Sequence, residues 1–117
     1  MGRMSQDTIF AKIARREIPA QIVYQDEDVT AFRDVAPAAP VHILVVPNKI
    51  IRSLDEAEPG DERLLGKMLL TAQKIAREQG IAKDGYRLVI NTNADGGQTV
   101  FHLHVHILGG QRLGRMA

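Results

Sequence analysis

The sequence predicts a single α+β domain, residues 1–117, whose mainly antiparallel sheet of five strands carries one long and one short helix. Three observations predict this class. Short polar or loop segments separate runs of β-branched residues, one long amphipathic segment follows the third run, and a length of 117 residues fits one domain better than two. The hydrophobic fraction of 44% and the charged fraction of 25% are those of an ordinary globular protein with one core.

The chain begins with a segment that favours a short helix. Apolar residues within 7–16 recur at the spacing of one helical face, and Asp7 or Thr8 can cap the first turn. Pro19 follows closely, and because proline interrupts the hydrogen-bond pattern of a helix, we expect the helix to end before it.

Three strand predictions come next. Residues 22–25 and 29–32 are rich in β-branched and aromatic side chains, and the polar turn 26–28 between them indicates a hairpin. Residues 41–46 are almost continuously apolar, which predicts a central strand covered on both faces and closed by Pro47.

The second half of the chain predicts the long helix and two further strands. Within 61–79, apolar residues recur every three or four positions, with Asp61 as the cap and Gly80 as the stop. Residues 86–91 and 103–108 are predicted strands, because they contain β-branched residues or alternate between polar and apolar side chains. A polar loop lies between them and completes the α+β pattern.

Composition and charge exclude several classes of protein. With no cysteine, the chain cannot form a disulfide framework, a thiolate zinc site, an iron–sulfur cluster or a cysteine nucleophile. The 15 basic and 14 acidic residues are interleaved, which argues against nucleic acid as a partner. No apolar run approaches the roughly 20 residues of a membrane span, and residues 1–7 lack the apolar core of a signal peptide, so we expect a cytoplasmic protein that binds no membrane.

Three of the four histidines lie in the five-residue stretch 102–106. Successive side chains of an extended strand point to opposite faces, so His102, His104 and His106 share one face, while the apolar residues between them share the other. The pattern predicts one apolar face against the core and one face that carries three imidazoles.

Two interpretations of this face involve no catalysis. It could be a solvated strand surface that happens to be rich in histidine. It could also bind a metal ion, with His42 as a further ligand, although three residues on a straight strand span too far for one tetrahedral centre. We predict no resident metal and no required cofactor, with adventitious zinc as the exception that a histidine cluster allows.

A third interpretation is nucleophilic catalysis at phosphorus. Imidazole has an ordinary pKa near 6.5, so at neutral pH much of it is a free base that attacks without first losing a proton. Neighbouring histidines can donate to phosphate oxygens or protonate a leaving amine or alkoxide. The Gly-rich turn 95–99 could add backbone N–H groups as an anion-binding nest.

The run 102–108 resembles the His-x-His-x-His-x-x signature of the histidine triad (HIT) superfamily, and 98–100 resembles its lead-in. Motifs along almost the whole chain resemble its nucleotide-binding branch (Hint): Asp7-Thr8-Ile9-Phe10, Glu17-Ile18-Pro19-Ala20, Ala31-Phe32-Arg33-Asp34, Ala39-Pro40-Val41-His42, Asp95-Gly96-Gly97-Gln98 and Leu108-Gly109-Gly110. The resemblance implies a HIT-like fold, a homodimer whose two sheets join into one, and hydrolysis of the P–N bond of purine nucleoside phosphoramidates.

The resemblance also implies residue roles. His104 would be the nucleophile that forms a covalent nucleotidyl-histidine, and His106 would contact the phosphate and lie on the leaving-group side. His102 and His42 would orient His104 and support its charge. Asp34 would accept hydrogen bonds from the ribose hydroxyls, a role that suits a carboxylate because it only accepts.

Further positions are implied as nucleotide contacts. Those near the phosphate or the leaving group are Asn91, Gly97, Gln98 and Thr99. Those of an apolar base pocket are Ile9, Phe10, Ile13, Phe32 and Val35.

Departures from related branches narrow the function. His106 stands where the uridylyltransferase branch has Gln, and there is no Cys-containing finger of the DNA-repair branch. The tail 111–117 lacks the Trp and Pro that close some eukaryotic members, which leaves the leaving-group preference open. Two alternatives remain at this point: hydrolysis of dinucleoside polyphosphates, and a nucleotide-binding interaction module that needs no turnover.

Overall fold

The computed structural model describes residues 7–116, so the sequence-based expectation about a signal peptide falls almost wholly outside it. In these residues, five strands form one sheet in the order β1-β2-β3-β5-β4, and every neighbouring pair is antiparallel. The elements are α1 (Ile9–Ala14), β1 (Ile22–Gln25), β2 (Val29–Arg33), β3 (Val41–Pro47), the short 3-10 helices η1 (Leu54–Glu56) and η2 (Pro59–Asp61), α2 (Glu62–Glu78), β4 (Tyr86–Val89) and β5 (Val105–Gly109). The predicted α+β fold class is confirmed.

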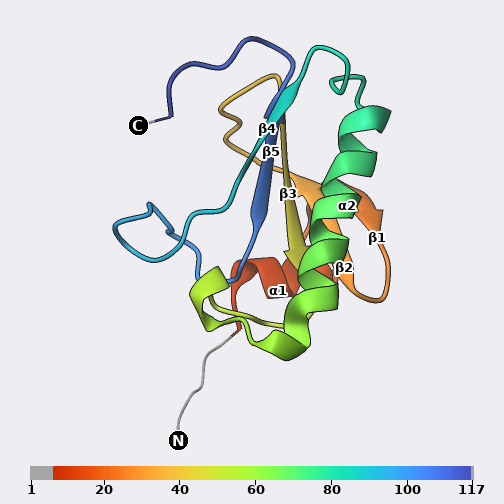
Figure 1. Ribbon diagram of the computed structural model, residues 1–117. Helices are drawn as coiled ribbons and strands as arrows, with labels where there is room; N and C mark the ends of the chain where they lie inside the picture. The colour runs from red at the N-terminus through yellow and green to blue at the C-terminus, as the bar shows by residue number, and fades with distance from the viewer. Residues whose placement is uncertain (1–6, 117) are drawn as a thin grey trace, which may run out of the picture.

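The two helices lie on opposite faces of the sheet. On one face, α2 packs along the sheet (Figure 1), and its buried residues meet inward-facing residues of β2, β3 and β5 in the larger core cluster. On the other face, Phe10 and Ile13 of α1 pack against Phe32, Leu44 and Val46 in a smaller cluster. Burial on both faces explains why β3 is almost continuously apolar.

The short helix α1 is capped by Thr8, whose hydroxyl accepts the backbone N–H of Ala11 at 3.1 Å. Thr8 is therefore the cap, and not the alternative Asp7. The helix ends at Ala14, before Pro19 as predicted, and Arg16 then takes a positive φ of 61° and turns the chain away.

The long helix α2 agrees closely with its prediction, except at its cap. Gly80, with φ +76°, ends it in a Schellman motif, in which the N–H groups of Gly80 and Ile81 bond to the carbonyls of Arg77 and Ala76. Asp61 occupies the N-cap position, as predicted, but its side chain makes no capping hydrogen bond. The carboxylate of Asp61 does not cap α2 because it accepts from Lys49 Nζ at 2.6 Å and from the N–H of Glu58 at 2.9 Å.

The last two strands are shorter than predicted. β4 ends at Val89, and β5 begins only at Val105. The N–H of Leu103 bonds to the carbonyl of Ile51, at 2.7 Å, in a segment that is not a strand. His102 and His104 therefore lie ahead of the β5 ladder, and only His106 lies within it.

Among residues 7–116, no helix combines the length and the apolar character that crossing a bilayer requires.

Candidate active site

The four histidines gather on the α1 face of the sheet. His42 comes from β3, His106 from β5, and His102 and His104 from the extended segment just before β5. The residues that alternate with them, Leu103, Val105 and Ile107, are buried in the core cluster on the α2 face. The predicted separation into an imidazole face and an apolar face is confirmed, but the imidazoles are not simply solvated.

His102 is completely buried and is bonded at both ring nitrogens. Its Nε2 lies 2.8 Å from the carbonyl oxygen of Pro47, which can only accept, so Nε2 carries the proton. Its Nδ1 lies 2.9 Å from Oγ1 of Thr8 and accepts the hydroxyl proton. Burial lowers the pKa of His102, and the ring is therefore neutral with one defined tautomer.

His104 has the geometry of a nucleophile. Its Nδ1 lies 2.7 Å from the carbonyl oxygen of His102, so Nδ1 donates and Nε2 keeps its lone pair. Burial lowers the pKa of His104, which keeps the ring neutral at neutral pH. Phe10 packs edge-on against the imidazole with centroids 5.0 Å apart and restricts its rotation.

His42 and His106 form a second pair. The N–H of Ala38 donates to Nδ1 of His42 at 3.0 Å, so the proton of neutral His42 is on Nε2. That Nε2 lies 2.9 Å from Nδ1 of His106, which therefore accepts, and the proton of His106 is on Nε2. Burial, followed by the nearby His104 and His42, lowers the pKa of His106 to about 4.

These contacts differ from the expected partners of His104. We expected His42 to orient His104, but its ring bonds to His106 instead. His102 does orient His104, through its backbone carbonyl and not through its imidazole.

Asp34, His42 and His106 each offer one ligand atom, and these atoms lie within 4.8 Å of one another, close enough for a metal ion in principle. Coordination through Nε2 of His42 needs a lone pair there, whereas its Nδ1 already accepts the N–H of Ala38. A metal-bound histidine ordinarily donates its other ring N–H instead. The hydrogen bonds thus favour a proton-carrying cluster, and the absence of a resident metal stays a prediction.

Asp34 lies just beyond the end of β2, beside His42. Its Oδ1 accepts the N–H of Ala36 at 2.8 Å, and its Oδ2 lies 3.5 Å from Nε2 of His42. Because each carboxylate oxygen has more than one acceptor site, Asp34 retains capacity for the hydroxyl groups of a ligand.

The loop after β4 differs from the anion nest that we expected. The N–H groups of Gly97 and Gln98 bond to the carbonyls of Ala94 and Asn93, each at 3.0 Å. Gly97 takes a φ of +85°, which its lack of a side chain allows. The nest prediction fails for these two amides because the turn satisfies them itself.

Gln98 is a second correction. Its side chain is buried, its Nε2 donates to the carbonyls of Arg52 and Val100, and its Oε1 accepts the N–H of Asn93. No amide proton of this side chain remains for a nucleotide, so Gln98 holds the loop in place. The adjacent Thr99 is exposed.

The remaining predicted contacts fall into distinct environments. Asn91 donates to the carbonyl of Gly96 at 2.7 Å and borders the loop. Phe10, Ile13 and Phe32 are buried members of the smaller core cluster, whereas Ile9 is 53% and Val35 98% exposed. Val35 follows Asp34 directly, so an exposed apolar side chain lies next to the carboxylate in sequence.

Two contributors to the site were not identified from sequence: the hydroxyl of Thr8, noted only as a helix cap, and the N–H of Ala38. Thr8 and His102 are 94 positions apart, and no local pattern reports such a contact.

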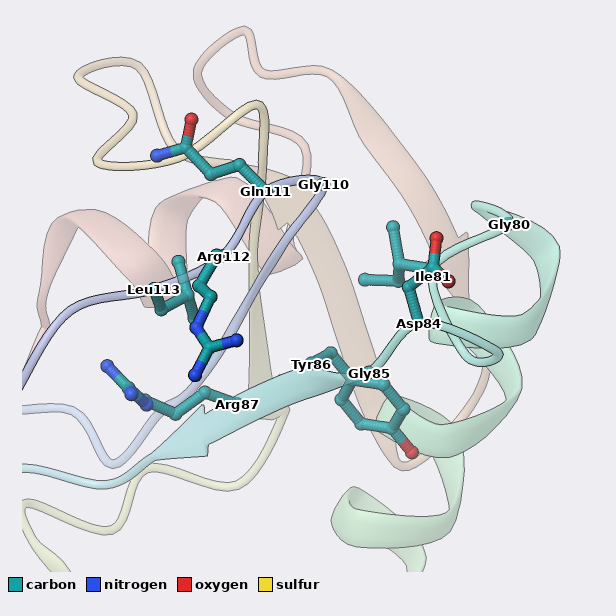
Figure 2. Close-up of a pocket in the computed structure, with 10 residues that line it drawn as sticks. All are labelled: Gly80, Ile81, Asp84, Gly85, Tyr86, Arg87, Gly110, Gln111, Arg112 and Leu113. Carbon is teal, nitrogen blue, oxygen red and sulfur yellow. The ribbon is translucent and has the colours of Figure 1, made fainter.

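A hollow of about 670 Å³ lies elsewhere (Figure 2). It is bounded by the end of α2, by β4 and by the tail after β5, and Figure 2 shows Arg87, Arg112 and Leu113 on one side with Ile81 and Asp84 on the other. None of the four histidines lines it. We place the site at the histidines because the oriented, chemically competent groups are there.

The model of the family described as "HIT domain" matches residues 15–113. The chain belongs to the HIT domain family. This HIT protein is 56% identical over 113 residues to the purine nucleoside phosphoramidase of Escherichia coli K12, covering 97% of this chain and 95% of that protein.

Solved structures of HIT proteins agree with the fold. A histidine triad protein from Clostridium difficile is 44% identical, with a TM-score of 0.92 and full coverage of both chains. A HIT family hydrolase from Legionella pneumophila is also 44% identical, with a TM-score of 0.90 over 92% of this chain and 96% of that one.

Proposed function

We propose that this HIT protein hydrolyses the P–N bond of purine nucleoside phosphoramidates. The observation that carries the proposal is the tautomer of His104: the carbonyl of His102 fixes the proton on Nδ1 and leaves a lone pair on Nε2. The similarity to the E. coli phosphoramidase over nearly the whole of both chains supports the choice of substrate class.

In the first step, Nε2 of His104 attacks the α-phosphorus and forms an N–P bond. The P–N bond to the substrate amine breaks, and the departing nitrogen takes the bonding electron pair and a proton. That proton enters with the substrate, whose phosphoramidate nitrogen is protonated before the bond breaks, because a neutral imidazole that gave up its only N–H would become an imidazolate. We assign Nε2–H of His106 as a hydrogen-bond donor on the leaving-group side, because its Nδ1 is engaged by His42 and its proton therefore points away from that contact.

In the second step, water attacks the phosphorus of the nucleotidyl-histidine, and the N–P bond to His104 breaks. The proton that water loses passes to solvent and balances the one that entered with the substrate. His104 is neutral again, and the products are a nucleoside monophosphate and an amine. We assign Asp34 to the ribose hydroxyls and Asn91, Gly97 and Thr99 to the surroundings of the phosphate. These roles are supported by position, since Asp34 lies beside His42.

We also propose that the active unit is a homodimer joined through β4. This strand is an edge of the sheet, so one row of its backbone groups has no neighbouring strand within residues 7–116. Leu69 and Leu70 of α2 are 45% and 65% exposed, and a second copy would cover such a surface. Sedimentation of Leu70→Glu beside Arg63→Glu tests this: we expect only the first variant to sediment as a monomer, and a dimer in both would contradict it.

The activity is tested with an adenosine phosphoramidate that carries a fluorescent amine. His104→Asn keeps an N–H group for the carbonyl of His102 but has no nucleophilic nitrogen, so we expect turnover to fall to background. Equal turnover in both proteins would contradict the proposal. Peptide mapping after acid-free trapping should locate the nucleotidyl group on His104, and faster cleavage of diadenosine tri- or tetraphosphate would instead favour a polyphosphate hydrolase.

A further inference from the structure

The nucleophile is held by few backbone contacts. Because β5 begins at Val105, the ladder of the sheet does not include His104. Just before it, the N–H of Leu103 bonds to the carbonyl of Ile51 at 2.7 Å, and the imidazole of His104 bonds to the carbonyl of His102. The direction of the His102 carbonyl therefore sets the direction of the His104 ring.

The His102 carbonyl is in turn fixed by its own side chain. The ring is hydrogen-bonded at Nε2 to the carbonyl of Pro47, which ends β3, and at Nδ1 to the hydroxyl of Thr8, which caps α1. A ring that is hydrogen-bonded at both nitrogens cannot flip, and the main chain that carries it is constrained with it.

The proton count shows why a hydroxyl is required at position 8. Nε2–H of His102 donates a hydrogen bond to the carbonyl of Pro47. Nδ1 therefore carries no proton and needs a hydrogen-bond donor. The oxygen of Thr8 accepts the N–H of Ala11, and its single hydroxyl proton is free to go to Nδ1. An acidic cap such as Asp would serve the helix equally well but would have no proton to give.

We propose that Thr8 is a positioning residue for the phosphoramidate hydrolysis described above, on which this inference rests. Its hydroxyl joins the cap of α1 to His102, and through the His102 carbonyl it keeps the proton of His104 on Nδ1 and Nε2 aimed at the substrate. Thr8 itself touches His102 and not the reacting atoms.

The test compares three single variants in the full chain. Thr8→Val keeps the shape but removes the hydroxyl, and we expect kcat to fall about tenfold, the effect of one well-placed hydrogen bond. The Kd for AMP, measured by calorimetry, should stay within about twofold, because Thr8 does not contact the nucleotide. Thr8→Ser restores both the cap and the donor and should recover most of kcat.

Lys12→Gly is the matched control. It weakens the exposed side of α1 by an amount comparable with the loss of a cap but leaves the bond to His102 in place, so kcat should stay within about twofold of the parent. An unchanged kcat in Thr8→Val, or an equal loss in Lys12→Gly, would overturn the proposal.

A spectroscopic measurement separates this inference from the proposed function. Imidazole ¹⁵N shifts of the parent protein should show the Nδ1–H form of His104 alone, and Thr8→Val should show a mixture of both tautomers. If the parent fails to cleave the phosphoramidate while these shifts change, the proposed function is wrong and the positioning role of Thr8 stands. Identical shifts in the two proteins overturn the role of Thr8.

Discussion

The neutral state of His106 couples the stability of the fold to pH. Its pKa is lowered from 6.5 to about 4, first by burial and then by the neighbouring histidines. Between these values the unfolded chain binds a proton that the folded chain does not, so the unfolding free energy rises with pH. This contribution is complete above pH 6.5 and is lost as the pH falls towards 4.

The gap between 6.5 and about 4 corresponds to roughly 3 kcal/mol, and the partial exposure of the ring reduces it to about 2 to 3 kcal/mol. His106→Gln retains a polar side chain but does not titrate. We therefore expect the parent to lose about 2 to 3 kcal/mol more stability than this variant between pH 7 and pH 4.

The assay is urea unfolding followed by circular dichroism at five pH values, with both proteins at one fixed concentration because a dimer makes stability depend on concentration. The carboxylates titrate in both proteins, so their contribution cancels in the difference. Parallel pH profiles for the two proteins would refute the burial argument, and a parent that becomes relatively more stable at pH 4 would reverse its sign.

Three further predictions follow from single contacts. Burial lowers the pKa of His104 below its ordinary 6.5, so as the pH is lowered kcat/KM should stay constant through pH 6.5 and decline only further into the acid range. A decline that is centred at or above pH 6.5 would contradict this. Gln98→Leu leaves three backbone groups without their side-chain partner, the N–H of Asn93 and the carbonyls of Arg52 and Val100, and should cost roughly 2 to 4 kcal/mol in urea unfolding. A loss below about 1 kcal/mol would show that the loop does not need these bonds. Gly80→Ala forces a side chain into a φ of +76° and should lower the unfolding free energy by about 1 kcal/mol, whereas an unchanged value would mean that α2 can end in another way.

The sequence pattern predicted most of the helices and strands, because their positions depend on residues that are close together in the chain. The hairpin of β1 and β2, the apolar β3 and the end of α2 at Gly80 each depend on neighbouring residues, and all were located within a residue or two. The start of β5 was missed because the partner of Leu103 is Ile51, some 50 positions earlier and not in a strand.

The site was predictable in its residues but less so in its connections. Alternation alone placed three histidines on one face. Which histidine contacts which was not accessible, since His42 reaches His106 across two strands whose register is fixed only in the folded sheet. Gln98 was predicted to contact the nucleotide, because the sequence does not show that both protons of its side-chain amide are used by backbone carbonyls. The nucleotide contacts and the cytoplasmic location stay predictions.

The bond between Thr8 and His102 makes the site depend on the docking of the first helix as well as on the sheet. It closes a loop of 94 residues, so the entropy of chain closure is overcome before the ring of His102 gains its second anchor. Local opening of α1 would carry Thr8 away from His102 while the five strands stay paired. The catalytic tautomer could then be lost in a protein that is otherwise folded.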